Sequence, residues 1–91
     1  MNFQQVSDKI SERGFRRSTT ARKVYDDNYV CHKIYDFEHR KRLDMFSVYL
    51  SEEGAVEQIE FTKVSFNPET KKYSQEVSRI DNMKELMRVL G

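Results

Sequence analysis

The sequence contains few of the residues that build disulfide frameworks, phosphate loops or membrane spans. Cys31 is its one cysteine, so no disulfide can form within the chain, and a reducing, cytoplasmic location is expected. No stretch approaches the roughly 20 apolar residues of a membrane helix, and the N-terminus lacks the basic start and apolar block of a secretory signal. The three scattered glycines cannot form a glycine-rich phosphate loop.

The chain also lacks an excess of charge of one sign. Its 16 Lys and Arg side chains are opposed by 15 Asp and Glu, for a net charge of +1, which is low for a strongly basic nucleic-acid binder. The charge is nevertheless uneven, because residues 1–42 hold ten cations against six anions and residues 43–91 hold six against nine. This asymmetry predicts one basic face, or electrostatic matching with a partner.

What the chain does contain is enough apolar material for one hydrophobic core. Of its 91 residues, 37% are apolar and 12% are aromatic, and a chain of this size can fold without help from disulfides. No repeat, linker or low-complexity tract interrupts it. We therefore expect a single domain over residues 1–91.

Helical spacing marks both ends of the chain. Phe3, Val6 and Ile10 recur at intervals of three and four, which predicts a helix over residues 2–13. Gly14 then suits the left-handed residue that ends many helices. At the other end, an apolar stripe with the same spacing predicts a second helix, and the pair Ser78 and Asp81 matches a helix-start pattern. The stripe consists of Ile80, Met83, Leu86, Met87 and Leu90.

Aromatic and β-branched residues between the helices predict four to five strands, of which four are placed at 29–37, 42–50, 55–66 and 71–77. Short connections favour an antiparallel sheet, so the expected fold class is α+β, with the sheet flanked by an N-terminal and a C-terminal helix. Both helices can cover one face, which leaves the other face free to bind. The polar strand 71–77 is expected at an edge.

The longest expected strand changes its phase of alternation. Ile59 and Phe61 are in phase with each other, whereas Val64 and Phe66 are in phase with each other but not with the first pair. One inserted residue would bring all four to a common face, so a bulge is predicted at 62–63.

No constellation of residues predicts catalysis, a metal or another cofactor. Adjacent Cys31 and His32 point to opposite faces of a strand and cannot form a thiolate–imidazole pair. The carboxylate pairs at 26–27 and 52–53 lie in expected turns, where no burial separates their pKa values. The candidate metal ligands around one hairpin match no known ligand spacing: they are Asp36, Glu38, His39 and Asp44. We therefore expect a protein that is not an enzyme.

Two basic segments remain as candidates for binding. RGFRRSTTARK, residues 13–23, is expected to be a basic connector, and HRKR, residues 39–42, is expected at a hairpin tip. The sequence leaves open whether they form one patch. The candidate binding residues are Arg16, Arg17, Arg22, Lys23, Arg40, Lys41 and Arg42.

These observations predict a small non-catalytic binding protein that regulates, inhibits or adapts a protein partner, since Arg and Tyr often dominate interface energies. Its size suits an accessory protein of a phage or mobile element, which would act in the host cytoplasm. One alternative is nucleic-acid binding, with basic loops 13–23 and 39–42 on phosphates and bases stacked on Tyr25, Tyr35 or Tyr49. Another is a homodimeric structural or assembly protein that pairs through strand 71–77 or 55–66.

The α-β-β-β-α order resembles, in topology, the double-stranded-RNA-binding domain. That family has a lysine-rich start to its second helix, whereas residues 78–85 here are mixed and slightly acidic. No residue role is carried over from this resemblance.

Overall fold

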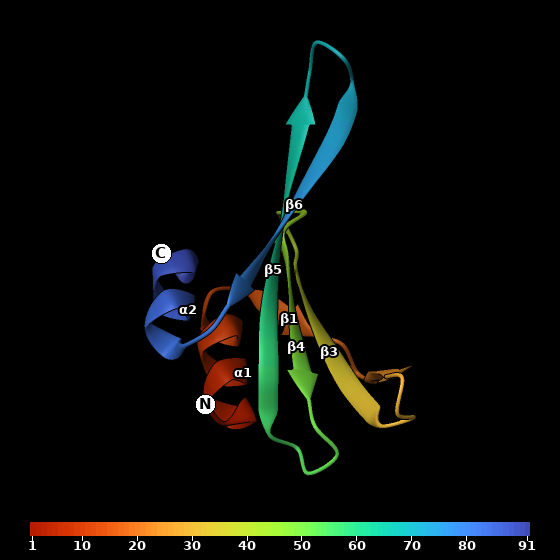
Figure 1. Cartoon of the computed structure of the whole chain (residues 1–91). Helices are drawn as coiled ribbons and strands as arrows, with labels where there is room; N and C mark the ends of the chain where they lie inside the picture. Colours follow the sequence, from red (N-terminus) through yellow and green to blue (C-terminus); the bar gives the residue numbers. More distant parts are fainter.

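The computed structural model describes all 91 residues as one antiparallel sheet with two helices, so the predicted α+β class is confirmed (Figure 1). The sheet has six strands rather than four to five, because the basic segment 13–23 is not a plain connector and contributes two short strands. The elements are α1 (Phe3–Glu12), β1 (Phe15–Arg17), β2 (Arg22–Tyr25), β3 (Cys31–His39), β4 (Met45–Leu50), β5 (Val56–Asn67), β6 (Lys72–Ile80) and α2 (Met83–Leu90).

The strands lie in the order β1-β3-β4-β5-β6, and β2 pairs with β3 beside β1. β1 pairs with residues 37–39 of β3 and β2 with residues 31–34, so β1 and β2 together form one interrupted edge strand. β6 forms the opposite edge, as predicted for 71–77. Every pairing is antiparallel, as the short connections required.

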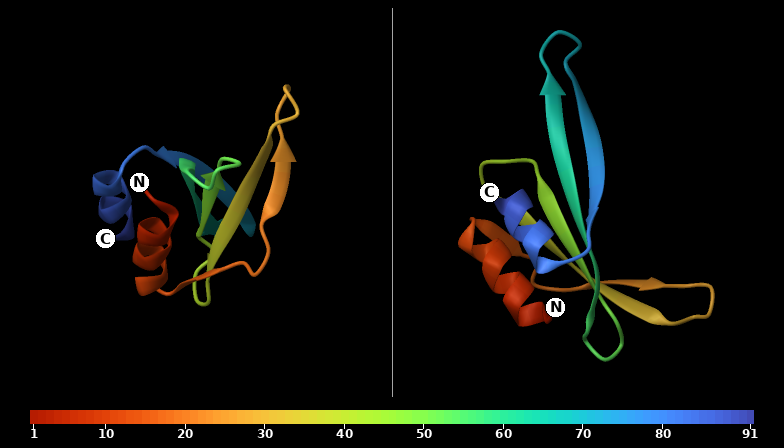
Figure 2. Two further views of the ribbon diagram at one scale, coloured as in Figure 1. Left: turned by 90° about the horizontal axis from the view of Figure 1, so that it is seen from below. Right: turned by 60° about the vertical axis from the view of Figure 1, so that its left-hand side comes forward.

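Both helices lie on the same face of the sheet (Figure 2). Side chains alternate along a strand, so Phe46, Val48 and Leu50 of β4 point to the helices while Ser47 and Tyr49 point away. Neither helix has the length and apolar character needed to cross a bilayer. The buried core consists of Val6, Ile10, Phe15, Phe37, Phe46, Val48, Leu50, Ile59, Ile80 and Leu86.

Local chemistry explains two boundaries that the sequence analysis misplaced. The second helix begins at Met83 rather than just after Ser78, because Asn82 is its cap and accepts a hydrogen bond from the Glu85 N–H at 2.8 Å. The strand expected at 29–37 begins two residues later, because the Asp26 side chain accepts hydrogen bonds from the backbone of residues 28 and 30 and holds a turn there. The following hairpin tip also begins later than expected, after His39.

β5 and β6 continue past the other strands as a two-stranded arm (Figures 1 and 2). β4 pairs with β5 only as far as Thr62, whereas β6 follows β5 to Asn67. Ile59 therefore points into the core, while Phe66 lies beyond the helices on the opposite face. The apolar residues of β5 therefore switch from one face of the strand to the other along its length, and no inserted residue is needed to explain the switch.

The bulge predicted at 62–63 is therefore wrong. Pairing between β5 and β6 is regular through those residues, and the irregularity lies between β4 and β5 at the other end of the strand. There Tyr49 is opposite Gln58 and Leu50 is opposite Val56, which leaves Glu57 without a partner on β4.

Gly14 ends α1 with a φ of +88° and lies directly against His39. A Cβ at this position would lie 2.9 Å from the His39 Nε2. We expect Gly14→Ala to lower the free energy of unfolding by about 2 kcal/mol or more, because a positive φ alone costs an L-residue ~1–2 kcal/mol.

Gly54→Ala is the matched control, measured by the same urea unfolding curves. Gly54 has a φ of +86° but no neighbour within 4 Å of an added Cβ, so it shares the backbone cost and lacks the steric one. Equal losses of stability in the two variants would contradict the close packing of His39 on Gly14.

Candidate functional site

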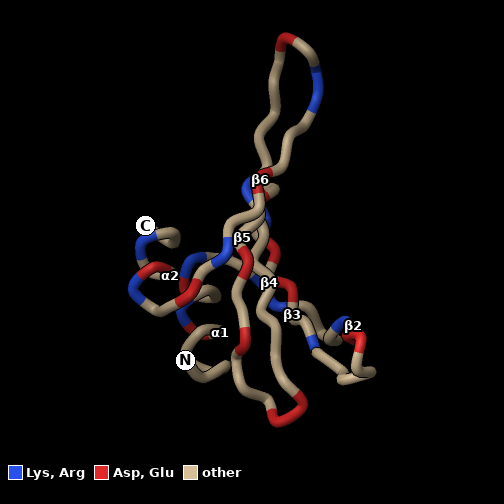
Figure 3. Tube along the Cα trace, viewed as in Figure 1, with Lys and Arg blue, Asp and Glu red and all other residues tan.

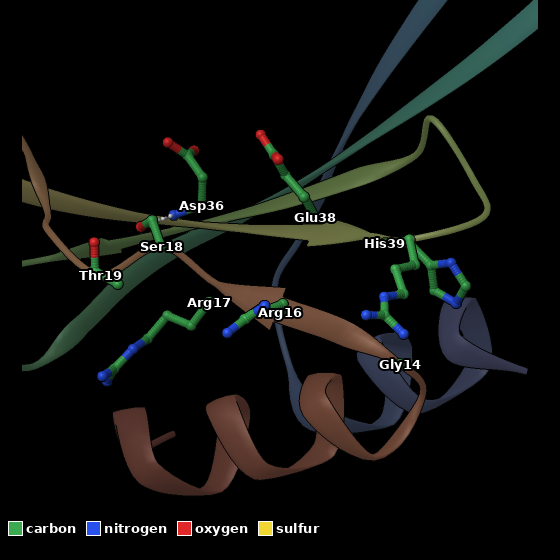
Figure 4. A pocket seen from close by; sticks show the side chains of 9 residues that line it. Gly14, Arg16, Arg17, Ser18, Thr19, Asp36, Glu38 and His39 are labelled. Carbon is green, nitrogen blue, oxygen red and sulfur yellow. Dashed lines mark hydrogen bonds between the residues drawn. The ribbon is translucent and has the colours of Figure 1, made fainter.

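The two basic segments meet at the β1 edge of the sheet. The register places Phe15 opposite His39 and Arg16 opposite Glu38, so the chain after α1 runs beside the end of β3. Residues of both segments line a groove of about 640 Å³, which we call the β1 groove (Figure 4). Its lining contains no apolar side chain and consists of Gly14, Arg16, Arg17, Ser18, Thr19, Asp36, Glu38, His39 and Arg40.

Three of the predicted binding residues line this groove with their charges available. Arg16, Arg17 and Arg40 are exposed, and none of them forms an ion pair within the chain. The Arg17 guanidinium lies 5.1 Å from the centre of the Tyr35 ring, a cation–π contact that restrains its stem. Lys41, exposed and without an ion pair, follows Arg40 at the tip of the hairpin. Segments 13–23 and 39–42 therefore contribute to one surface.

Two other predicted binding residues are occupied by partners within the chain. Arg22 donates to both carboxylate oxygens of Asp36, at 2.6 and 2.9 Å, and Asp36 also accepts from the Ser47 hydroxyl at 2.8 Å. The hydrogen bond to Asp36 raises the pKa of Arg22, and the hydrogen bond from Arg22 lowers the pKa of Asp36. Arg42 is paired with Asp44, and donates from both Nε and Nη2 to one oxygen of that carboxylate. The charges of these two arginines are therefore not free for a partner.

Lys23 lies outside the groove as well. It is opposite Lys33 in the β2–β3 pairing, and both side chains are exposed. Two like charges in direct cross-strand contact are unfavourable, and nothing in the surrounding structure compensates them.

The groove also contains acidic groups, which the sequence analysis did not place there. Glu38 is exposed and forms no ion pair, while the half-buried Asp36 is paired with Arg22. Figure 4 shows both carboxylates on the β3 side and Arg16 and Arg17 on the β1 side. Over the whole molecule, acidic residues also gather at the β4–β5 turn, far from the groove (Figure 3). The groove is therefore basic on one side and mixed on the other.

The tyrosines predicted to stack on bases are mostly engaged elsewhere. Tyr35 lies on the helix-covered face, where Phe3 stacks on it at a centroid distance of 5.1 Å. The Tyr49 hydroxyl donates to Glu60 at 3.1 Å on the helix-free face. Only Tyr25, at the distal end of β2, is exposed. Alternation along a strand separates two faces but does not show which of them the helices will cover.

No family model matches the chain. No curated protein and no solved structure matches it either, so the function has to be inferred from its own residues.

The structure also places the groups considered above as candidates for catalysis or metal binding. No group of three or more His, Cys, Asp and Glu side chains is placed to hold a metal ion. His32, which the sequence places beside Cys31, is held by carboxylates at both ring nitrogens: Nε2 lies 2.9 Å from Asp26 and Nδ1 lies 2.9 Å from Glu57. Glu57 is the unpaired residue of the β4–β5 irregularity. His32 thus ties the β2–β3 turn to β5.

This arrangement predicts a pH dependence of stability. The hydrogen bond to Asp26, with a further contribution from Glu57, raises the pKa of His32 above 6.5. Because the folded state holds the proton more tightly, the stabilisation is present below about pH 6.5 and is lost as the pH rises through the raised pKa. His32→Gln should therefore be less stable than the wild type at about pH 5.5 and differ little at about pH 8.5.

Urea unfolding at the two pH values tests this, with Asp26→Asn as a second variant that removes the stronger partner. A difference between wild type and His32→Gln that does not change with pH would contradict the ionic contribution.

Proposed function

We propose that the chain is a non-catalytic binding protein whose partner is a protein carrying an acidic, extended segment that binds in the β1 groove. One observation carries the proposal: Arg16, Arg17 and Arg40 line one groove beside a free sheet edge without ion pairs, Arg16 from the helix-free face and Arg17 from the helix-covered face. Arginine is, with tryptophan and tyrosine, one of the residue types that most often dominate the energy of protein interfaces. Such binding suits a regulator, an inhibitor or an adaptor.

The free edge supplies the backbone part of this recognition. β1 pairs only with β3, so the outer side of Phe15–Arg17 has no strand beside it. An extended peptide can add a strand to such an edge, where main-chain hydrogen bonds provide affinity and side-chain pockets provide specificity. Acidic side chains on that peptide would meet Arg16, Arg17 and Arg40, and their attraction would speed association at low salt.

The lining of the groove favours a protein over a nucleic acid. Glu38 would lie close to any backbone of phosphates that passed through the groove. A peptide can avoid this repulsion by placing a neutral or basic side chain there, whereas a phosphate backbone cannot. The ring of Tyr35 is already in contact with Phe3 and with the Arg17 guanidinium, which leaves it poorly placed for stacking on bases.

The proposal is tested by fluorescence anisotropy with a labelled peptide that alternates Glu with Val. Binding at low salt should weaken about tenfold or more in Arg16→Glu, because one favourable contact becomes repulsive. Lys84→Glu is the matched control, since Lys84 is exposed on α2, carries the same charge and lies outside the groove. No binding by the wild type, or equal losses in both variants, would overturn the proposal.

Nucleic-acid binding is the second candidate, favoured by the hydroxyl of Thr19 beside the three arginines. It is tested in the same instrument with labelled single- and double-stranded DNA and RNA. Micromolar binding that falls steeply between about 50 and 200 mM salt would support it in place of the peptide. A cytoplasmic location, and an origin in a phage or mobile element, stay predictions.

A further inference from the structure

The second edge of the sheet has a feature that the proposed function does not use. β6 runs for nine residues, Lys72–Ile80, with β5 on one side and no strand on the other. Its pairing with β5 has no bulge, and it contains no proline. Bulges, prolines, short lengths and charged side chains are the usual means by which proteins protect an edge strand from further pairing. β6 has only the last of these, in Lys72, Glu76 and Arg79, so its backbone is open to another strand that accommodates those charges.

The arm also exposes an apolar strip beside that edge. Phe66, Tyr73 and Val77 are 51%, 64% and 59% exposed. Phe66 is opposite Tyr73 in the β5–β6 register, and their ring centroids lie 4.9 Å apart. All three side chains are on the face of the sheet that carries no helix, so no part of the chain covers them.

We propose that β6 pairs antiparallel with β6 of a second copy of this chain, around a two-fold axis at Gln75. In this register Tyr73 lies opposite Val77 of the second copy, and by symmetry Val77 lies opposite Tyr73 of the second copy. Each apolar strip is thereby extended across the interface, from Phe66 through Tyr73 to Val77 of the other chain. Aromatic and β-branched cross-strand pairs of this kind stabilise a sheet.

The charges of β6 exclude one neighbouring register. Centring the axis one residue later would place Glu76 directly opposite Glu76 of the second copy, which is repulsive. Centring it one residue earlier would place Glu76 opposite Lys72 of the second copy, but Tyr73 and Val77 would then face polar residues and both apolar pairs would be lost. With the axis on Gln75, Glu76 faces Ser74 and lies diagonal to both Lys72 and Glu76 of the second copy. The apolar pairs therefore select the Gln75 register, and their match between two identical strands is the reason for choosing a second copy over an unrelated strand.

The shape of the molecule leaves room for this pairing. The arm projects away from the helices and the rest of the sheet (Figure 1), so in an antiparallel pair the two bodies lie at opposite ends of the joined arms. The β1 groove is at the other edge of the sheet and stays open in both copies. A dimer would therefore present two grooves and bind a repeated or dimeric partner with increased avidity.

Light scattering coupled to size exclusion tests the dimer directly. The wild type should reach a mass of twice the 10.9 kDa of one chain as its concentration rises. Gln75→Lys should stay at the mass of one chain, because two lysines would then face each other on the axis. Ser74→Lys is the control, since it adds the same charge on the neighbouring residue but faces Glu76 of the second copy and should keep the dimer.

A mixture of two variants separates a broken interface from a damaged fold. Gln75→Glu should also be monomeric on its own, and mixing it with Gln75→Lys should restore the double mass through a lysine–glutamate pair on the axis. A wild type that keeps the mass of one chain at every concentration, or a dimer that Gln75→Lys leaves intact, would overturn the proposal. Peptide binding in the β1 groove does not depend on the outcome, so the two proposals fail separately.

Discussion

Phe46→Ala is expected to lower the free energy of unfolding by about 3–5 kcal/mol, since it deletes a fully buried aromatic side chain from the centre of the core. Phe46 is 1% exposed and lies on β4, the middle strand of the sheet order. The centre of its ring lies 4.9 Å from that of Phe15, in an edge-on contact, and 4.7 Å from that of Phe61, whose ring is tilted against it. The cavity left by alanine would be lined by groups from three strands, which cannot all move to fill it.

Urea unfolding followed by far-ultraviolet circular dichroism measures this loss. Domains of this size have a total stability of roughly 5–15 kcal/mol, so the variant should unfold at a much lower urea concentration. Phe66→Ala is the matched control, because Phe66 lies on the exposed arm and its removal should cost about 1 kcal/mol or less. A similar loss in the two variants would mean that Phe46 is not the centre of the core.

The second large effect is expected at Asp44, a carboxylate that is only 8% exposed. One of its oxygens accepts a hydrogen bond from the Val64 N–H at 3.0 Å, and the other accepts from the Arg42 Nε at 2.9 Å. Val64 lies just past Thr62, the last residue of β5 that pairs with β4, so Asp44 secures the base of the arm. Asp44→Ala leaves both donors without a partner and should cost about 2–3 kcal/mol.

The same group predicts a loss of stability in acid. Burial by itself would raise the pKa of Asp44, but the hydrogen bonds from Val64 and Arg42 outweigh it and lower the pKa below its usual 3.8. A lowered pKa contributes stability above the usual value that disappears as the pH falls through the lowered one.

Asp44→Asn keeps the shape and loses the charge, so it isolates this ionic contribution. Its deficit relative to the wild type should be largest near neutral pH and should shrink between about pH 5 and pH 2, where the wild-type carboxylate becomes protonated. Urea unfolding across this range measures the difference. A deficit that stays constant down to the lowest pH would contradict the role of the Asp44 charge.

The parts of the fold that depend on local spacing could be predicted from the sequence. The first helix could be predicted because Phe3, Val6 and Ile10 recur with helical period. Its end at Gly14 could be predicted because the positive φ at a helix terminus favours glycine. β1 was not visible, because it is three residues long and two of these are arginines. It is a strand only because it pairs with β3, from which it is distant in sequence.

The sequence predicted which residue types form the candidate site, but not which individual residues lie in the groove. The arginine-rich segments were identified correctly as exposed, yet Arg22 is neutralised by Asp36, fourteen residues away, and no local pattern indicates that contact. Arg42 and Asp44 are only two residues apart in the sequence. The position of Asp44 next to the apolar strand that follows it could have indicated this pairing. The phase change in β5 was also a real signal, although it marked the exposed arm and not a bulge.

Nuclear magnetic resonance on the isotope-labelled chain would locate the binding surface most directly, with the acidic Glu–Val peptide as the titrant. Binding in the β1 groove should shift the backbone amide signals of residues 14–19 and 38–41 and leave those of α2 and the arm unchanged. Shifts confined to α2 or the arm, or no shifts at low salt, would contradict the assignment of the β1 groove as the binding site.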